Sequence, residues 1–361
     1  MQVRKLASIK TISNIMAIEG RDKIVLATVD GWNVIVKKDE FQIGDKCVYC
    51  EIDSVMPETE QFEFLRSKKF RIKTMKMAGV ISQGICFPLD ILPPKEYKVD
   101  EDVTDILGIT QYEPTMDIEP KTKKASSYKY PKCLMKFKWF RDLVYRKDHR
   151  AGKGFPSFIS KTDETRIQNA PFYLEDKREW IVTEKIDGQS GTFCLVRHKS
   201  IIPFVKDKFE YIVCSRNLRL FKKNDASYWQ VSDKYNIEQV LKNIIGNNEW
   251  VCIQGECISP KVQGNKYKVT EADLYAFNLI YPTGRMSSVE AKKILEKENI
   301  KFVPIVDEHF ILPDTVNEML EYAHAESVLG NTIREGVVVR SADGKQSFKA
   351  VDPLFLIKYD E

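Results

Sequence analysis

The chain has 361 residues, of which 43% are hydrophobic and 30% are charged, and its formal net charge is +4. This composition is typical of a globular protein with room for two domains, and it excludes a disordered chain. No apolar run approaches the roughly 20 residues that a membrane span needs, and no signal-peptide core follows Met1. We therefore expect an intracellular protein, cytoplasmic or nuclear, without a membrane partner.

Cysteine usage is consistent with that compartment. The eight cysteines lie in strand-like segments as small hydrophobic residues, which predicts reduced thiols. Cys47 and Cys50 have the spacing of zinc ligands, but residues 46–52 have the pattern of a strand, in which positions three apart point to opposite faces. No second Cys-x-x-Cys follows and the four histidines are scattered, so we do not expect a structural zinc site.

Residues 1–94 are predicted to form an OB-like β-barrel domain. Short strand-like pieces alternate with turns, and Asp30-Gly31 between two of them is a hairpin signal. The pieces are 24–29, 32–36, 46–52 and a last pair on either side of Ser82-Gln83-Gly84. A basic loop at 66–76 carries six Lys or Arg residues. Such a barrel is suited to nucleic-acid binding, and it can equally be a structural appendage.

Residues 95–153 are expected to be a connector, acidic at first and then strongly basic. Residues 121–153 hold twelve Lys or Arg and two Asp, a local balance of +10, and aromatic residues are interleaved with them. Basic and aromatic side chains together suit a phosphate backbone with exposed bases. The alternative is a linker and an amphipathic helix at 131–147, whose aromatic residues pack inward while its charges are only solvated. The two interpretations are compatible, and both stay open.

The third region, 154–361, is organised around Lys185. An apolar strand at 180–182 continues into Thr183-Glu184-Lys185-Ile186-Asp187-Gly188 and then into a second strand at 192–196. A lysine at such a strand end can be a covalent nucleophile if neighbouring cations and partial burial lower its pKa. The alternative is a hairpin with a solvated lysine. The polar residues 161–169 are expected to form either a capped helix or the wall of a cleft.

Several later strands carry polar or aromatic residues that a reaction site needs. These residues are Arg216 after strand 211–214, Glu256 at the end of 250–256, Phe277 within 274–280, Glu335 before 336–340, Lys349 within 347–351, and Lys358 after 354–357. Helical patterns at 287–297 and 315–329 complete an α+β domain with antiparallel sheets. Taken singly, Phe277 is more typical of a core and the charged residues of a solvated surface.

Taken together, these residues have the chemistry of nucleotidyl transfer. A lysine that attacks a nucleotide phosphate needs a divalent metal, acidic groups for the metal's waters, cations for the phosphate oxygens and an aromatic face for the base. The acidic groups, the cations and the aromatic face are supplied in turn by Asp187, Glu256 and Glu335, by Arg216, Lys349 and Lys358, and by Phe277.

The order of these motifs resembles that of the covalent nucleotidyltransferases, the superfamily of ATP-dependent RNA and DNA ligases and mRNA capping enzymes. The matching stretches are Glu184-Lys185-Ile186-Asp187-Gly188, Ser215-Arg216-Asn217, Gln254-Gly255-Glu256, Tyr275-Ala276-Phe277-Asn278, Glu335-Gly336-Val337-Val338, Phe348-Lys349 and Ile357-Lys358. They cover nearly all of the region from about residue 155 to the end. The arrangement looks most like the RNA ligase branch, in which an OB domain precedes a C-terminal nucleotidyltransferase domain with an ATP-grasp-like fold.

The resemblance implies an ATP-dependent RNA ligase that uses Mg²⁺ or Mn²⁺. Such an enzyme seals RNA ends that carry a 3′-hydroxyl and a 5′-phosphate, through lysyl-AMP and RNA-adenylate intermediates, and we expect it to act as a monomer. Lys185 would be the nucleophile, and Lys349 would contact the α-phosphate of ATP. Asp187, Glu256 and Glu335 would bind the metal, largely through waters.

The same resemblance places three residues around the nucleotide. Glu184 would border the adenine pocket, Phe277 would stack on the adenine, and Arg216 would bind the ribose or a nucleic-acid phosphate. One departure concerns the last motif, which often has two lysines separated by one residue. Here Lys349 is followed by Ala350 and Val351, so it is open whether Lys358 takes the second role.

Other functions are ranked below this one. A capping enzyme or a DNA ligase usually carries an OB domain after the last motif, and only three residues follow Lys358. A DNA-joining role stays open, because phosphate binding does not itself distinguish the sugars. The alternative from another class is a nucleic-acid-binding protein with an inactive nucleotidyltransferase site, although no residue of the site is visibly missing.

Overall fold

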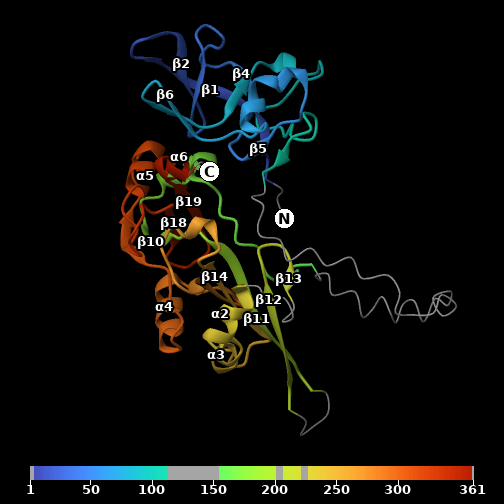
Figure 1. The fold of residues 1–361 in the computed structure, drawn as a ribbon, viewed down its shortest axis with the longest axis vertical. Coiled ribbons are helices and arrows are strands. Elements are labelled where there is room, and N and C mark those ends of the chain that lie inside the picture. Colours follow the sequence, from blue (N-terminus) through green and yellow to red (C-terminus); the bar gives the residue numbers. More distant parts are fainter. Residues whose placement is uncertain (1–3, 113–153, 201–205, 221–226, 360–361) are drawn as a thin grey trace, which may run out of the picture.

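The computed structural model describes residues 4–112, 154–200, 206–220 and 227–359 (Figure 1). The N-terminal region forms one body, and the C-terminal region forms a second body below it in that view, with the C-terminal end at the boundary between them. The predicted basic helix at 131–147 lies outside the described residues. The predicted boundaries near residues 94 and 153 stay predictions.

The N-terminal region is built on a five-stranded antiparallel sheet in the order β3-β2-β1-β4-β8. The long strand β1 pairs with β4 through residues 7–11 and with β2 through residues 12–18, so it bends from one half of the sheet to the other. This is the expected OB-type fold. Its strands are β1 (Ala7–Ile18), β2 (Arg21–Val29), β3 (Trp32–Lys37), β4 (Lys46–Cys50) and β8 (Ile85–Phe87).

Local sequence explains the first hairpin of this sheet. Asp30 has a φ of 49° and is followed by glycine, so the chain turns between β2 and β3. The strands around Ser82-Gln83-Gly84 do not pair with each other, because β7 pairs with β6 and β8 pairs with β4. The smaller elements are β5 (Ser54–Val55), β6 (Met75–Met77), β7 (Val80–Ser82), β9 (Thr110–Gln111) and the 3-10 helices η1 (Glu60–Lys68) and η2 (Leu89–Ile91).

Two antiparallel sheets make up the C-terminal region. A four-stranded sheet has the order β17-β10-β18-β19, and a six-stranded sheet has the order β13-β12-β11-β14-β15-β16. The first contains β10 (Glu179–Lys185), β17 (Ile305–Ile311), β18 (Gly336–Ser341) and β19 (Ser347–Val351). The second contains β11 (Gln189–His198), β12 (Lys208–Cys214), β13 (Arg219–Leu220), β14 (Trp250–Ile258), β15 (Asp273–Tyr281) and β16 (Gly284–Arg285). The strands before and after the Lys185 turn therefore belong to different sheets, and the hairpin alternative is wrong.

Short helices cover one face of each sheet. Helices α2 and α3 pack on the six-stranded sheet, α4 packs on β15, and α5 packs on β18 and β19. The helices are α2 (Ser227–Lys234), α3 (Ile237–Ile244), α4 (Ser288–Lys297), α5 (Val316–Ala323) and α6 (Pro353–Tyr359), with 3-10 helices η4 (Ile167–Asn169), η5 (Pro171–Glu175) and η6 (Gln263–Asn265).

Helix boundaries follow from capping. Ser287 accepts a hydrogen bond from the Glu290 amide at the start of α4, and Thr315 forms a capping box with Glu318 at the start of α5. The predicted helix at 287–297 is confirmed. The one predicted at 315–329 is wrong at its end, because His324 is already extended and a loop follows.

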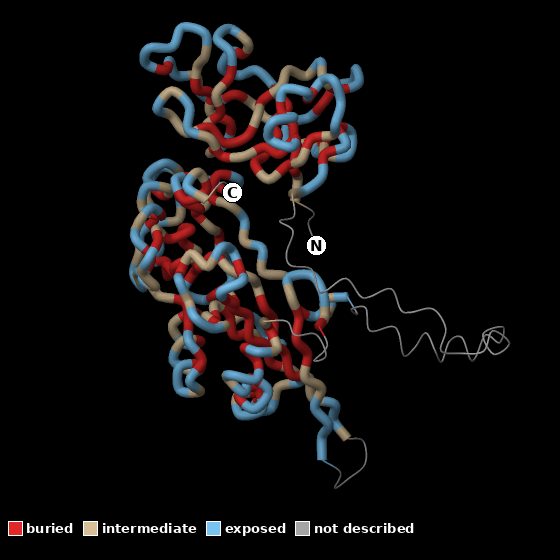
Figure 2. Tube along the Cα trace, viewed as in Figure 1, coloured by how far each residue is buried: buried red, intermediate tan, exposed pale blue. Residues whose placement is uncertain are grey.

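Buried segments run through both bodies (Figure 2). The N-terminal core also takes in Val351 of β19 and Leu356 of α6, so the two regions share apolar packing. The seven cysteines in the described part of the chain are buried, and none of them forms a disulfide bond with another. Within the described ranges, no helix is long and apolar enough to cross a membrane.

Candidate active site

Lys185 lies at the end of β10, where the chain crosses from one sheet to the other. Gly188 makes this crossing possible, because a Cβ there would lie 2.6 Å from the carbonyl oxygen of Cys257 in β14. The amide of Asp187 donates a hydrogen bond of 2.8 Å to the hydroxyl of Tyr267, which fixes the turn. Thr183 and Lys185 point away from the side of β10 that packs on the helices, because alternate strand residues face opposite ways.

Carboxylates surround the ammonium group of Lys185. Its Nζ lies 2.6 Å from Oε2 of Glu335, which stands just before β18. Burial alone would lower the pKa of Lys185, but the charges of Glu335, Glu256 and Asp187 outweigh burial and raise the pKa above its ordinary value. The protein's own charges therefore do not meet the condition that neighbouring cations and partial burial lower the pKa of Lys185.

The pKa of Glu256 is also shifted by the neighbouring negative charges. It lies on β14 of the other sheet, so the site is formed between the two sheets. Burial raises the pKa of Glu256 to about 8, the charge of Lys185 opposes that shift, and the charges of Glu335 and Asp187 add to it. A divalent cation would relieve this repulsion.

The donor chemistry of Asp187, Glu256 and Glu335 fits such a cation. Carboxylate oxygens are the ligands that Mg²⁺ and Mn²⁺ prefer, and Mg²⁺ usually keeps several of its waters. In the described part of the chain, no group of three or more His, Cys, Asp or Glu is close enough to hold a metal directly. Binding largely through waters stays a prediction.

Lys266 is a site residue that the sequence patterns did not single out. It follows η6, in which Gly264 and Asn265 adopt left-handed conformations, and its buried ammonium group forms an ion pair with Asp187. Its Nζ also lies 4.8 Å from the ring centroid of Phe355. The available signal was the Gly-Asn turn shortly after the Glu256 strand.

Lys349 brings positive charge to the same face of the four-stranded sheet. Thr183 pairs with Val338, which pairs with Lys349, so Lys349 shares the face of Thr183 and Lys185. Its Nζ donates a hydrogen bond of 2.9 Å to Oδ1 of Asp163. Burial, together with the charges of Arg166 and Lys185, lowers the pKa of Lys349 to about 8 although Asp163 opposes the shift.

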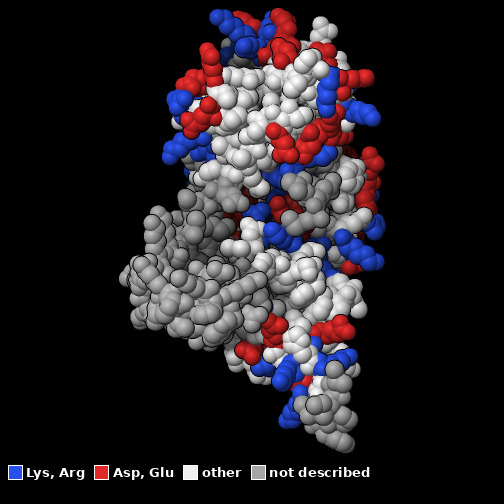
Figure 3. Space-filling model, turned by 90° about the vertical axis from the view of Figure 1, so that its right-hand side faces the viewer, with Lys and Arg blue, Asp and Glu red and all other residues white. Residues whose placement is uncertain are grey.

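Asp163 joins Lys349 to Arg216. Its Oδ2 lies 3.3 Å from Nη2 of Arg216, and the neighbouring cations Lys349 and Arg216 overcome its burial and lower its pKa to about 2. Residues 161–166 form an irregular wall and only 167–169 form a 3-10 helix, so the capped-helix alternative is wrong. On the face drawn in Figure 3, basic and acidic side chains gather where the two regions meet.

Three further predicted residues have other partners than the residues of this cluster described so far. Glu184 is buried and accepts hydrogen bonds from Oγ of Ser327 at 2.5 Å and from the amide of Val328 at 2.9 Å. Phe277 is the extra residue of a β-bulge in β15, half-buried, with the guanidinium carbon of Arg340 6.0 Å from its ring centroid. Lys358 is exposed on helix α6.

The site and its two supporting sheets form a nucleotidyltransferase domain of the ligase type, which follows an OB-fold domain in the chain. A family model of an OB-fold domain matches residues 6–89, and the family model named RNA ligase matches residues 178–359. The chain belongs to the RNA ligase family. A search of curated protein sequences finds no match.

Solved structures agree over the whole length. The chain is similar to Naegleria gruberi RNA ligase with PPi, with a TM-score of 0.81, 30% identity and coverage of 99% of each chain. A mutant of that ligase without ligand gives a TM-score of 0.80 and 31% identity, covering 100% of this chain and 99% of that one. A mutant with ATP and Mn gives a TM-score of 0.80 and 30% identity, covering 99% and 100%.

Proposed function

We propose that this protein is an ATP-dependent RNA ligase that seals 3′-hydroxyl and 5′-phosphate RNA ends through a lysyl-AMP intermediate on Lys185. The observation that carries the proposal is the position of Lys185, whose ammonium lies between carboxylates from both sheets and shares a face with Lys349. Family membership and the similar structures with ATP and Mn support it.

In the first step the neutral amine of Lys185 attacks the α-phosphorus of ATP. A phosphorus–nitrogen bond forms, the bond to the bridging oxygen breaks so that pyrophosphate leaves, and the nitrogen releases one of its two protons to solvent and keeps the other. Lys349 stabilises the negative charge that develops on the α-phosphate oxygens. A divalent metal held by Asp187, Glu256 and Glu335 would offset the carboxylate charges that now keep Lys185 protonated.

In the later steps the 5′-phosphate of an RNA end displaces Lys185 from AMP, and a 3′-hydroxyl then displaces AMP from the activated end. Each displacement exchanges one phosphorus bond for another, so no further reactant is required. Arg216 is exposed and paired with Asp163, where it can bind a ribose or a nucleic-acid phosphate. Phe277 would stack on the adenine, and Glu184 would border its pocket.

The test is transfer of label from α-labelled ATP to the purified protein with Mg²⁺ or Mn²⁺. The wild type should keep label after denaturation, and both Lys185→Ala and Lys185→Arg should keep none. The arginine variant is the matched control for folding, because it retains a cation beside Glu335 but cannot act as the nucleophile. No label on the wild type would leave a nucleic-acid-binding protein with an inactive site.

Sealing assays decide the substrate. Nicked duplexes with RNA or with DNA at either side of the nick should be joined best when RNA supplies the ends. Equal joining of DNA ends would favour the DNA-joining alternative. Label from GTP alone would instead indicate capping chemistry.

A further inference from the structure

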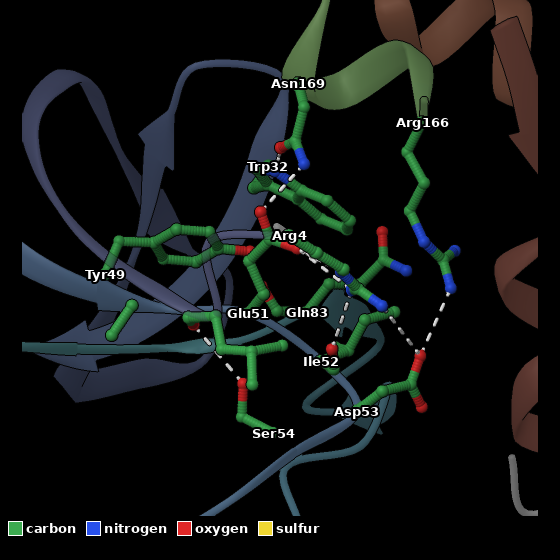
Figure 4. Close-up of polar contacts among 12 residues, drawn as sticks. Arg4, Trp32, Tyr49, Glu51, Ile52, Asp53, Ser54, Gln83, Arg166 and Asn169 are labelled. Carbon is green, nitrogen blue, oxygen red and sulfur yellow. Dashed lines mark hydrogen bonds and ion pairs between the residues drawn. The ribbon is translucent and has the colours of Figure 1, made fainter. Parts of the chain in front are cut away.

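The N-terminal domain holds residues 166–169 of the catalytic domain through a set of polar contacts (Figure 4). The indole Nε1 of Trp32 donates a hydrogen bond of 2.6 Å to Oδ1 of Asn169. The Asn169 amide nitrogen donates one of 2.7 Å to Oε1 of Glu51. Both ends of this side-chain amide are thus bound by the N-terminal domain, which fixes its orientation.

Two further contacts join the N-terminal domain to Gln168 and Arg166. The amide of Gly31 donates a hydrogen bond of 3.1 Å to the carbonyl oxygen of Gln168. Arg166 lies with Nη2 3.4 Å from Oδ2 of Asp53. Trp32, Glu51 and Gln168 are buried, so these contacts are shielded from water and are stronger than surface contacts.

The gripped residues continue directly into the active site. The backbone amide of Lys349 donates a hydrogen bond of 2.8 Å to the carbonyl oxygen of Thr165. Asp163, two residues earlier, binds the ammonium group of Lys349, and Thr162 lies 2.7 Å from the hydroxyl of Ser190 in the other sheet. One short segment therefore links the N-terminal domain to Lys349 and to both sheets.

The strand of Lys349 is held from the same direction by apolar packing. Val351 stands two residues after Lys349 on β19 and is buried in the core of the N-terminal domain, together with Leu356 of α6. Lys349 thus lies between two points at which the N-terminal domain contacts the catalytic domain. A rotation of the N-terminal domain would move both points at once.

Some buried polar atoms at this interface between the two domains have no hydrogen-bond partner. Among the described residues, Nη1 of Arg166 and both side-chain amide atoms of Gln168 are buried without a hydrogen-bond partner. Buried polar groups without partners cost free energy and offset part of what the interface contributes. We therefore expect the loss of a single contact to shift the equilibrium between the state in which the two domains make these contacts and the state in which they do not.

We propose that Trp32, Glu51 and Asp53 are positioning residues, which act by holding residues 165–169 so that Lys349 and Asp163 stand correctly beside Lys185. The N-terminal domain then influences the first chemical step through its contacts with residues 165–169. This inference rests on the proposed lysyl-AMP chemistry.

The main test uses Gly31→Ala. A Cβ on Gly31 would lie 2.7 Å from Cα of Gln168, so the two domains cannot approach as they do. Gly154→Ala is the matched control, because a Cβ there would have no atom within 4 Å, and neither glycine has a positive φ. Two quantities are measured: single-turnover label transfer from ATP at saturating ATP, and amide hydrogen exchange in 165–169 and 347–351.

Gly31→Ala should slow label transfer between about 10-fold and about 100-fold, as expected when a catalytic group is displaced by about 1 Å. Exchange should become faster in both segments, while Gly154→Ala should match the wild type in both measurements. Faster exchange with an unchanged rate of label transfer would overturn the proposal. Unchanged exchange would also overturn it, since the contacts would then hold nothing.

Asn169→Ala tests the same grip from the catalytic domain and leaves the N-terminal domain intact if Gly31→Ala does not fold. The two substitutions should be non-additive, with the double variant no slower than the slower single variant, because they break one interface. Multiplying effects would show that the N-terminal domain acts by a separate route. Absence of label on the wild type would remove the lysyl-AMP chemistry itself, a result distinct from any difference between variants.

Discussion

Lys185 and Lys349 lie on one face of one sheet, on strands separated only by β18, yet their surroundings shift their pKa values in opposite directions. Lys185 is held by Glu335 and has a raised pKa, whereas burial and neighbouring cations lower the pKa of Lys349 to about 8. The difference arises because Glu335 and Glu256 bring carboxylates from both sheets to Lys185, while Arg166 brings a second cation to Lys349.

The proposed reaction requires the two lysines in different protonation states, and the contrast is consistent with that requirement. Lys349 is needed as a cation, and at pH 7 a group with a pKa of about 8 is still mostly charged. Lys185 is needed as a neutral amine, and its carboxylate neighbours delay that state until their charge is offset. We therefore expect a metal bound by Asp187, Glu256 and Glu335 to favour the neutral amine of Lys185.

The largest expected effect comes from removing the cation at Lys349. Lys349→Met should slow label transfer from ATP by about 100-fold to about 1,000-fold, because a preorganised group at the developing charge is lost. The melting temperature should not fall, since burial disfavours the charge that the substitution removes. Single-turnover labelling and thermal melting measure the two quantities.

Lys349→Arg is the matched variant for that test. It restores charge but not the compact shape of an ammonium group, so partial recovery is expected. A loss of melting temperature that accounts for the loss of rate would assign Lys349 a structural role and end the contrast between the two lysines.

A smaller effect is expected when the balance at Lys349 is changed without removing it. Asp163 raises the pKa of Lys349 against burial and against the charges of Arg166 and Lys185. Asp163→Asn should therefore lower that pKa further below about 8, so Lys349 loses its proton at lower pH. The alkaline limb of the pH–rate profile for label transfer should move toward lower pH, with a larger loss of rate at pH 8 than at pH 6.5.

Glu164→Gln provides the control for this profile. Glu164 is the neighbouring carboxylate, but it binds Arg285 and Ser347 and not Lys349. Its substitution should change the rate without moving the alkaline limb. An equal displacement of the limb in both variants would mean that Asp163 acts through the wall as a whole and not through Lys349.

The sequence predicted features that depend on neighbouring residues, but not contacts between residues that are far apart in the chain. The order of the strands and the position of Lys185 before an Asp-Gly turn are local patterns, and together with the order of the motifs they were sufficient to predict the α+β fold and the RNA ligase family. The ion pair between Lys185 and Glu335 joins residues 150 positions apart, and the bond between Trp32 and Asn169 spans 137 positions. Local patterns do not encode which sheet receives each strand, so the pKa direction of Lys185 could not be read from them.

The smallest effect on the rate is expected at the second lysine position, where Lys266 and Lys358 can be compared directly. Lys266 is buried and paired with Asp187, whereas Lys358 is exposed on α6. Lys266→Met should leave a buried carboxylate without this ion pair and lower the stability without metal by about 3 kcal/mol. Saturating Mn²⁺ should return most of that loss, because the metal supplies the missing positive charge.

Lys358→Met is the matched substitution. As for other exposed side chains, it should change both the folding equilibrium constant and the rate constant of label transfer by less than about twofold. Thermal melting with and without Mn²⁺ separates the two lysines. If Mn²⁺ stabilised the wild type and Lys266→Met equally, the positive charge of Lys266 and that of the metal would not replace one another. Lys358 would then be the candidate for the second lysine of the family's last motif. If Mn²⁺ stabilises Lys266→Met more than the wild type, as we expect, Lys266 in the turn after β14 supplies the positive charge that the motif around Lys349 lacks.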